Sequence, residues 1–299
     1  MLKFGKAADV RWFTSSRRSI SMELTLGKTQ FNLVYNSFSF VIAIMGAALL
    51  FSLLVRNRVA PQHRTAVTLS TLVVGVALYH YVRIFGSWNE AFSFTNAKFV
   101  QNGRPFNEGY RYVDWLVTVP LLLAELVVVL KLSRAKTRSL LVRLSIAAVA
   151  MIALGYPGEI SGAHSSARTI WAAASTLPFL YILFVLFVEL SRSLDRQSVG
   201  VRKLVGVLRY IILATWGVYP IAYMLPSLID DQSKALVARQ VMYSLGDVLA
   251  KPLFGVLVLS IALAKSHEDG YVEAGFVSSG PIDELDSRVP DGAREILGS

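Results

Sequence analysis

The sequence predicts an all-α membrane protein, a seven-transmembrane-helix bundle. Of its 299 residues, 54% are hydrophobic and 17% are charged, whereas soluble domains carry about 25% charged residues. A bilayer core needs about 20 consecutive apolar residues per helix, and the chain contains seven such stretches. They cover roughly residues 31–55, 66–88, 109–130, 139–156, 168–190, 204–226 and 239–264.

The connections between these spans are short, which favours one bundle of sequence-adjacent helices. We therefore expect one domain over residues 31–265, flanked by two tails. Residues 1–30 are basic and rich in serine, and we interpret them as an extracellular tail or a targeting segment of the organellar kind. Residues 266–299 are acidic, and we expect a disordered cytoplasmic tail without an output domain.

The basic residues indicate membrane orientation and not nucleic-acid binding. The net charge is +10, but Lys and Arg cluster beside the apolar spans, where the positive-inside rule expects them. Five basic residues lie in the even-numbered connections, namely Lys98, Arg104, Arg168, Lys234 and Arg239. Eleven lie in the odd-numbered connections, namely Arg56, Arg58, Arg64, Lys131, Arg134, Lys136, Arg138, Arg192, Arg196, Arg202 and Lys203. The N-terminus is therefore predicted outside and the C-terminus in the cytoplasm. We expect the protein to lie in the plasma membrane, or in an organellar membrane if residues 1–30 are a targeting peptide.

Neither thiol chemistry nor a metal site is predicted. The chain has no cysteine, which excludes disulfides and cysteine-ligated metals. The four histidines are too scattered along the chain to predict a metal site.

Ionisable residues inside the spans are the informative feature, because each costs at least about 2.5 kcal/mol at a helix centre. On the seventh span, Asp247 and Lys251 are four residues apart and share one helix face. They form either a buried ion pair or the site where the lysine makes a Schiff base with a carbonyl ligand. The spacing alone does not choose between these two interpretations.

The third span adds carboxylates on both sides of that lysine. Asp114 and Glu125 are eleven residues apart, which places them on one helix face about 16 Å apart. With the N-terminus outside, Asp114 and Asp247 lie on the outer side of Lys251 and Glu125 lies on the inner side. Lys251 and Arg111 balance the two aspartates, so Glu125 has no counter-charge and is expected to be protonated. Any one of these charges could instead be a structural helix contact.

Three segments carry a resemblance to a known family. RYVDWLVTVPLL in the third span, WGVYP in the sixth and DVLAKP in the seventh resemble microbial rhodopsins, and among them the proteorhodopsin and xanthorhodopsin-like proton pumps. The resemblance covers roughly residues 31–265. It implies a transporter and not an enzyme, with all-trans-retinal bound covalently as a Schiff base to Lys251.

The resemblance also implies roles for the intramembrane charges. Asp114 matches the primary counterion and proton acceptor, and Asp247 matches the second counterion. Thr118 and Glu125 complete the Asp, Thr, Glu pattern of these pumps, which makes Glu125 the cytoplasmic proton donor. Arg111 matches the arginine that balances the counterions and gates the exit side.

One further polar match lies on the second span, where His80 matches a histidine that hydrogen-bonds the acceptor carboxylate. Without the family, a lone histidine there would be interpreted as a satisfied core residue. Around the chromophore, the resemblance implies an aromatic cage with polar neighbours, which alone would be ordinary packing. The matching residues are Tyr112, Trp115, Trp216, Tyr219, Pro220 and Tyr243.

Two positions bear on colour and on a second pigment. Leu122 falls at the position that tunes colour in proteorhodopsins, and its apolar side chain predicts green absorption. Ala172 stands where xanthorhodopsin-like proteins have the glycine that opens a window for a carotenoid antenna. Because alanine narrows such a window, the resemblance leaves carotenoid binding open.

The predicted function is a light-driven outward proton pump with the lipid bilayer and protons as partners, in a homo-oligomer that is a trimer or a pentamer. A sensory photoreceptor is the main alternative, and Glu125 argues against it because sensors commonly lack the inner donor. A pump for another ion is the second alternative, but such pumps carry different residues at positions 114, 118 and 125. A seven-helix receptor without retinal is the third alternative, and Lys251 argues against it.

Overall fold

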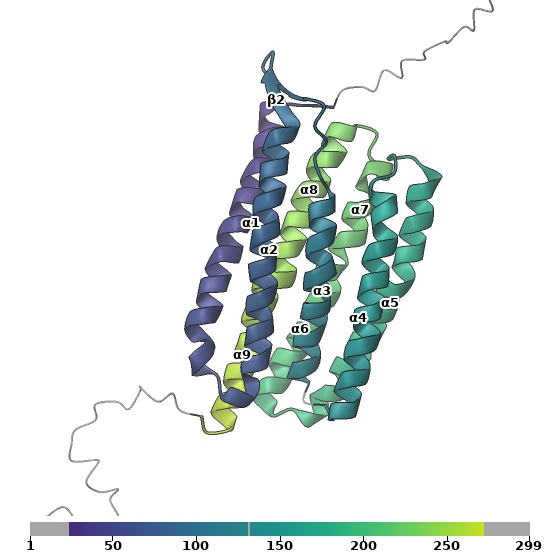
Figure 1. Ribbon diagram of the computed structural model, residues 1–299. Helices are drawn as coiled ribbons and strands as arrows, with labels where there is room; N and C mark the ends of the chain where they lie inside the picture. The colour runs from purple at the N-terminus through teal and green to yellow at the C-terminus, as the bar shows by residue number, and fades with distance from the viewer. Residues whose placement is uncertain (1–23, 131, 272–299) are drawn as a thin grey trace, which may run out of the picture.

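Seven helical spans long and apolar enough to cross a membrane make up the described part of the chain, as the sequence predicts. The computed structural model describes residues 24–130 and 132–271. The first five spans are α1 (Lys28–Val55), α2 (Arg64–Ala91), α3 (Gly109–Val129), α4 (Arg134–Glu159) and α5 (Ser166–Ser193). The sixth consists of α6 (Val199–Trp216) and α7 (Val218–Leu228), and the seventh of α8 (Gln232–Val248), the π-helical turn η4 (Leu249–Leu253) and α9 (Phe254–Glu268). They lie side by side in one bundle (Figure 1).

The surface of the bundle is apolar and its interior carries charge. Leu54, Phe184 and Ile146 expose 80%, 68% and 65% of their area. Several charged side chains of the third and seventh spans are almost completely buried. This distribution is the reverse of that in a soluble protein and fits helices that face lipid.

The seventh span changes its winding beside Lys251, and the sequence explains why. Pro252 has no backbone N–H, so it cannot donate to the carbonyl oxygen one turn earlier. The helix widens there into the single π-helical turn η4. Lys251 lies in this turn with only 2% of its area exposed, so the irregular backbone presents the amine to the bundle interior.

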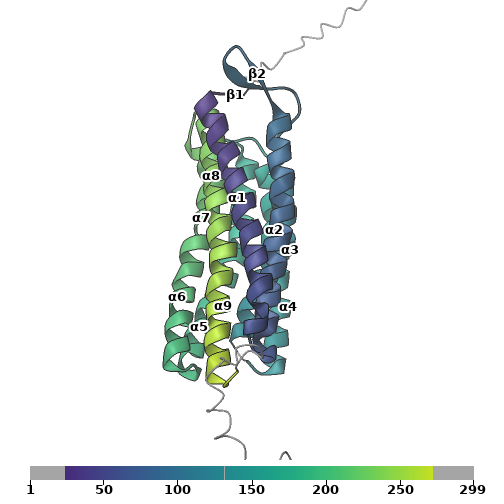
Figure 2. The same ribbon diagram turned by 90° about the vertical axis from the view of Figure 1, so that its left-hand side faces the viewer.

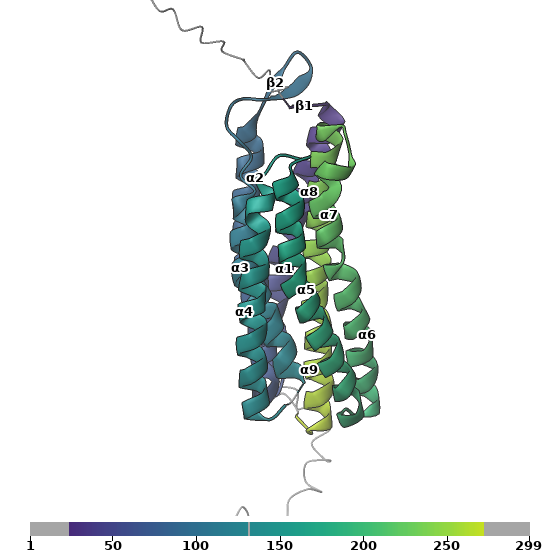
Figure 3. The ribbon, with the colours of Figure 1, turned by 90° about the vertical axis from the view of Figure 1, so that its right-hand side faces the viewer.

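A short sheet covers one end of the bundle. Strands β1 (Thr25–Leu26), β2 (Phe92–Thr95) and β3 (Lys98–Gln101) pair antiparallel in the order β1-β3-β2. Asn96 and Ala97 turn the β2–β3 hairpin with positive φ angles of 50° and 62°, as a type I′ turn requires. We call this the sheet end, and the opposite end, where α9 stops, the tail end (Figures 2 and 3).

Aromatic packing holds the sheet on α1 and α2. The rings of Phe31 and Phe99 stack with centroids 3.8 Å apart and planes within 4°. The ring centroids of Trp88 and Phe92 lie 5.6 and 5.9 Å from the ring centroid of Phe31. The sheet is therefore part of the folded bundle and not a loose loop.

The boundaries differ from the prediction at several helix ends. Helix α1 begins at Lys28 and β1 precedes it, so the folded part starts inside the segment that we predicted as a tail. Arg168 and Arg239 are corrected from loop residues to buried residues of α5 and α8, with 1% and 8% exposure. Residues 1–23 and 272–299 of the predicted tails, and Lys131, lie outside the described residues.

Replacement of Phe31 by alanine should destabilise the sheet end. A buried Phe→Ala substitution typically costs about 3 kcal/mol or more, so the melting temperature followed by circular dichroism should fall. Phe40 on the same helix is 58% exposed, and Phe40→Ala should change stability by less than about 1 kcal/mol. Equal melting temperatures for the two variants would contradict this packing argument.

Candidate functional site

Four charged side chains meet inside the bundle. Lys251 Nζ contacts Oδ2 of Asp114 and lies 3.1 Å from Oδ1 of Asp247. Arg111 Nη1 lies 3.3 Å from Oδ2 of Asp247. Each of the four is at most 2% exposed, so two positive and two negative charges balance each other away from water. Buried charges persist only when paired in this way. We call these four residues the ion cluster.

Asp247 is surrounded by donors. Besides Lys251 and Arg111, its Oδ2 accepts a hydrogen bond from the Tyr81 hydroxyl at 2.6 Å. Its Oδ1 accepts from the Tyr219 hydroxyl at 2.8 Å and from Trp115 Nε1 at 3.3 Å. Hydrogen bonds to an ionised carboxylate are the strong ones, so this set fixes Asp247 in place as an anion.

Asp114 has fewer partners and retains acceptor capacity. Its Oδ1 has no hydrogen-bond partner among the described residues. His80 Nδ1 lies 3.9 Å from that oxygen and donates instead to the Val76 carbonyl at 3.0 Å. The direct bond from His80 that the resemblance implied is therefore not formed in this structure. The Thr118 hydroxyl donates to the backbone carbonyl of Asp114 at 2.9 Å.

Glu125 lies farther along α3, toward the tail end, and is 1% exposed. Its Oε1 accepts a hydrogen bond from the Ser70 hydroxyl, while its Oε2 has no partner among the described residues. A Cβ atom at Gly255 would lie 3.1 Å from Ser70 Oγ, so glycine permits α9 to approach this pair closely. Glu125 is therefore a buried carboxyl group without a paired cation in the described chain.

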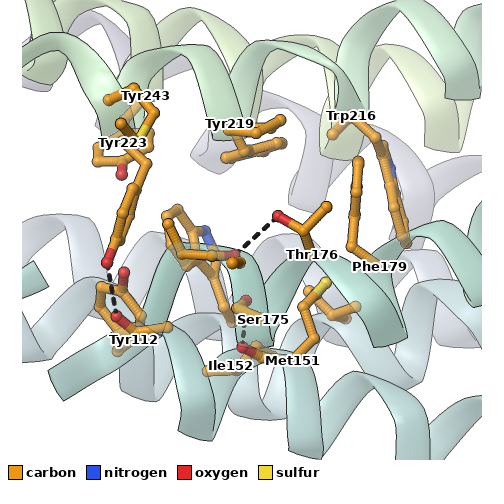
Figure 4. Close-up of a pocket in the computed structure, with 18 of the residues that line it drawn as sticks. Tyr112, Met151, Ile152, Ser175, Thr176, Phe179, Trp216, Tyr219, Tyr223 and Tyr243 are labelled. Atoms are coloured by element: carbon orange, nitrogen blue, oxygen red, sulfur yellow. Dashed lines mark hydrogen bonds between the residues drawn. The ribbon is translucent and has the colours of Figure 1, made fainter. Parts of the chain in front are cut away.

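A cavity of about 320 Å³ adjoins Lys251. Residues of α3, α4, α5, α6, α7, α8 and η4 line it, and most of their side chains are apolar or aromatic (Figure 4). The cavity is lined by all eight residues predicted for retinal: Tyr112, Trp115, Leu122, Trp216, Tyr219, Pro220, Tyr243 and Lys251. Ala172, predicted at the carotenoid window, also lines it. An amine at one wall and an apolar remainder fit an apolar ligand that carries an aldehyde, as retinal does.

Sequence reasoning missed several residues around this site. Tyr81 bonds both Asp247 and Arg111, and its position one residue after His80 was the available signal. Glu159 Oε2 accepts hydrogen bonds from the hydroxyl groups of Tyr112 and Tyr243, each at 3.1 Å. It was missed because the fourth span was predicted to end at residue 156, three residues too early. Met151 and Phe179 also line the cavity (Figure 4), but nothing in the sequence distinguished them from lipid-facing residues.

Comparison with known proteins identifies the family. A family model described as bacteriorhodopsin-like protein matches residues 32–265. The chain belongs to this family. A green-light absorbing proteorhodopsin from the gamma-proteobacterium EBAC31A08 is 30% identical to this rhodopsin over 233 residues, 77% of this chain and 86% of that one.

Two solved structures are similar to this rhodopsin over their whole length. A thermophilic rhodopsin and xanthorhodopsin, described as a light-driven ion pump with dual chromophore, are each 46% identical and cover 84% of this chain and 100% of their own. Their TM-scores are 0.79 and 0.78. The predicted resemblance and the seven-helix fold are thereby confirmed. Membership of the family implies a retinal chromophore and a lipid environment.

Replacement of Lys251 by alanine should abolish the visible absorbance band of protein reconstituted with all-trans-retinal. The amine that would form the covalent bond is then missing, although the apolar cavity remains. Absorbance spectra after purification measure this loss. Lys234→Ala serves as the control because Lys234 is exposed at the sheet end, and a retained band in Lys251→Ala would contradict the assignment.

Proposed function

We propose that this rhodopsin is a light-driven outward proton pump, in which Lys251 holds the proton, Asp114 accepts it and Glu125 replaces it. The observation that carries the proposal is the unequal surroundings of three carboxyl groups about one amine. Asp114 and Asp247 contact Lys251 Nζ directly. Glu125 lies toward the tail end without a cationic partner among the described residues.

The cavity beside Lys251 supports retinal as the cofactor. When bound to Lys251, retinal supplies light absorption and an isomerisation that reorients the proton-bearing nitrogen. Trp115 and Leu122 on α3 and Trp216 and Tyr219 on the sixth span would enclose its apolar body. Because most of the cavity lining is apolar, it offers water few hydrogen-bond partners.

The surroundings of Asp114 favour it over Asp247 as the acceptor. Asp247 has five donors, so a proton placed on it would disrupt several charge-assisted hydrogen bonds. Asp114 keeps one oxygen without a hydrogen-bond partner in the described chain and touches Lys251 with the other. Transfer from Nζ to Asp114 neutralises both groups, and Asp247 and Arg111 remain as a balanced pair.

Glu125 is suited to return a proton to Lys251. Without a paired cation, its neutral form avoids a buried negative charge, and its bond with Ser70 holds it in place. The sheet end would face outside and the tail end the cytoplasm, as the distribution of Lys and Arg supports. Protons then enter past Glu125 and leave past Asp114. The trimer or pentamer, and carotenoid binding near Ala172, stay predictions from the resemblance.

The direct test is the pH of an unbuffered suspension of bacterial cells that express the protein with all-trans-retinal under green light. Acidification that a protonophore removes is expected for outward proton pumping. A coloured protein without any pH change would favour a sensory photoreceptor. A rise in pH that the protonophore enhances would indicate transport of another ion.

Replacement of Asp114 by asparagine should remove the acceptor while preserving the size of the side chain. A positioned proton-transfer group contributes about 10²-fold or more to the rate, so light-driven acidification by Asp114→Asn cells should fall below detection. The exposed Asp230 near the sheet end provides the control Asp230→Asn. Outward pumping at the wild-type rate in Asp114→Asn would contradict the assignment.

Replacement of Glu125 by glutamine should slow the return of the proton to Lys251 and leave its departure unchanged. We expect the reprotonation step, followed by flash-induced absorbance changes, to slow by about 10²-fold. Glu268→Gln, at an exposed position of the tail end, should leave both steps unaltered. Identical reprotonation rates in Glu125→Gln and wild type would exclude Glu125 as the donor.

A further inference from the structure

A chain of hydrogen bonds leads from the ion cluster to the sheet end. Arg111 Nη2 donates to Gln240 Oε1 at 3.0 Å, and Gln240 Nε2 donates to Glu108 Oε1 at 2.6 Å. Since a guanidinium group only donates and a carboxylate only accepts, these two neighbours fix the orientation of the Gln240 amide. Gln240 is completely buried, whereas the Glu108 side chain is 13% exposed. The chain of hydrogen bonds therefore ends at a carboxylate that reaches the protein surface.

A second group of charges braces that carboxylate. Arg239 Nη2 lies 2.5 Å from Glu108 Oε1, and its Nη1 lies 2.5 Å from Glu159 Oε1. Arg168 Nη2 lies 3.5 Å from the same oxygen of Glu159. Two arginines thus balance two glutamates. These four residues come from α4, α5, α8 and the position before α3. Glu159 is completely buried and has no surface access, so Glu108 alone of the two glutamates meets the outside.

Packing at the end of α4 holds this second group of charged residues in position. A Cβ atom at Gly158 would lie 1.9 Å from the Tyr223 hydroxyl oxygen and 2.9 Å from Trp171 Cβ. Only glycine permits this approach, which brings Glu159 to Arg168. The position of Glu108 therefore depends on contacts from α4, α5 and α8 together.

Two features suit Glu108 to carry a proton. Burial raises the pKa of its carboxyl group above the usual value, against the opposing influence of the adjacent Arg239. The charged and polar groups that face it are Arg239, Glu159, Arg111 and Gln240. In addition, the Nε–H groups of Arg111 and Arg239 are buried and have no acceptor among the described residues. Both cations thus keep a donor available for water along this route.

We propose that Glu108 is the outermost proton acceptor of the exit path, and that Gln240 is the positioning residue that aligns it with Arg111 and the ion cluster. This inference rests on the proposed outward pumping. Protonated Asp114 loses its proton, the Glu108 carboxylate takes one up, and Glu108 then gives it to water at the sheet end. One proton leaves per cycle and both carboxylates are restored.

The test follows proton release by the full-length protein with retinal in detergent, using a water-soluble pH indicator after a laser flash. The variants are Glu108→Gln, which cannot accept a proton, and Gln240→Met, which keeps the side-chain length but removes the amide. Both should slow the appearance of the proton in bulk water by about 10-fold or more, without slowing the earlier loss of the proton from Lys251. Glu108→Asp should restore most of the rate.

The control is Glu90→Gln, an exposed glutamate at the sheet end of α2, which should release protons at the wild-type rate. Wild-type release in both Glu108→Gln and Gln240→Met would overturn the inference while leaving the proposed function intact. Equal slowing of every step, including loss of the proton from Lys251, would assign these residues a structural role and also overturn it. If Glu108→Gln fails to bind retinal, Gln240→Met decides by the same criterion. Wild-type protein that releases no proton would instead contradict the proposed function itself.

Discussion

The buried ion cluster of Lys251, Asp114, Asp247 and Arg111 is the interaction on which the rest of the structure depends. Each charge removed from water costs several kcal/mol, and removal of one partner from a buried pair typically costs about 3–5 kcal/mol. The helices must therefore converge so that every charge meets its partner. The second, third, sixth and seventh spans all contribute donors or acceptors to this cluster. Because each of these groups must meet its partner, the cluster fixes the positions of those spans along one another.

The proposed function depends on differences among the carboxyl groups around Lys251 more than on the overall neutrality of the ion cluster. Asp247 is held by five donors, whereas Asp114 retains an oxygen without a partner in the described chain. Glu125 lies beyond them and, among the described residues, accepts a hydrogen bond only from Ser70. In the proposed mechanism, a proton that leaves Lys251 passes to the carboxylate of Asp114 on one side, and Glu125 returns a proton from the other. The same asymmetry gives the proposed transport its direction.

Much of this arrangement could be predicted from the sequence because it depends on local spacing. The seven apolar stretches predict the spans, and the four-residue spacing of Asp247 and Lys251 places both on one helix face. The eleven-residue spacing from Asp114 to Glu125 likewise predicts one face of α3. The aromatic residues of the cavity were found only through the resemblance, because aromatic residues on apolar helices are ordinarily packing.

The remaining features depend on tertiary contacts and carried no local signal. The strands of the sheet are only two to four residues long, too short for a pattern of alternating side chains. Glu108, Glu159 and Arg239 come from distant segments and meet only in the folded bundle. Arg168 and Arg239 lie at the margins of the apolar stretches, where burial depends on neighbouring helices. The orientation of the His80 ring toward Val76 is also a tertiary outcome.

Flash-induced infrared difference spectroscopy on protein labelled at aspartate carboxyl groups tests the central claim most directly. The account predicts that the carbonyl stretch of a protonated aspartic acid appears as Lys251 loses its proton, and that this band is absent from Asp114→Asn. A band that persists unchanged in Asp114→Asn would contradict the account, because another aspartate would then be the acceptor.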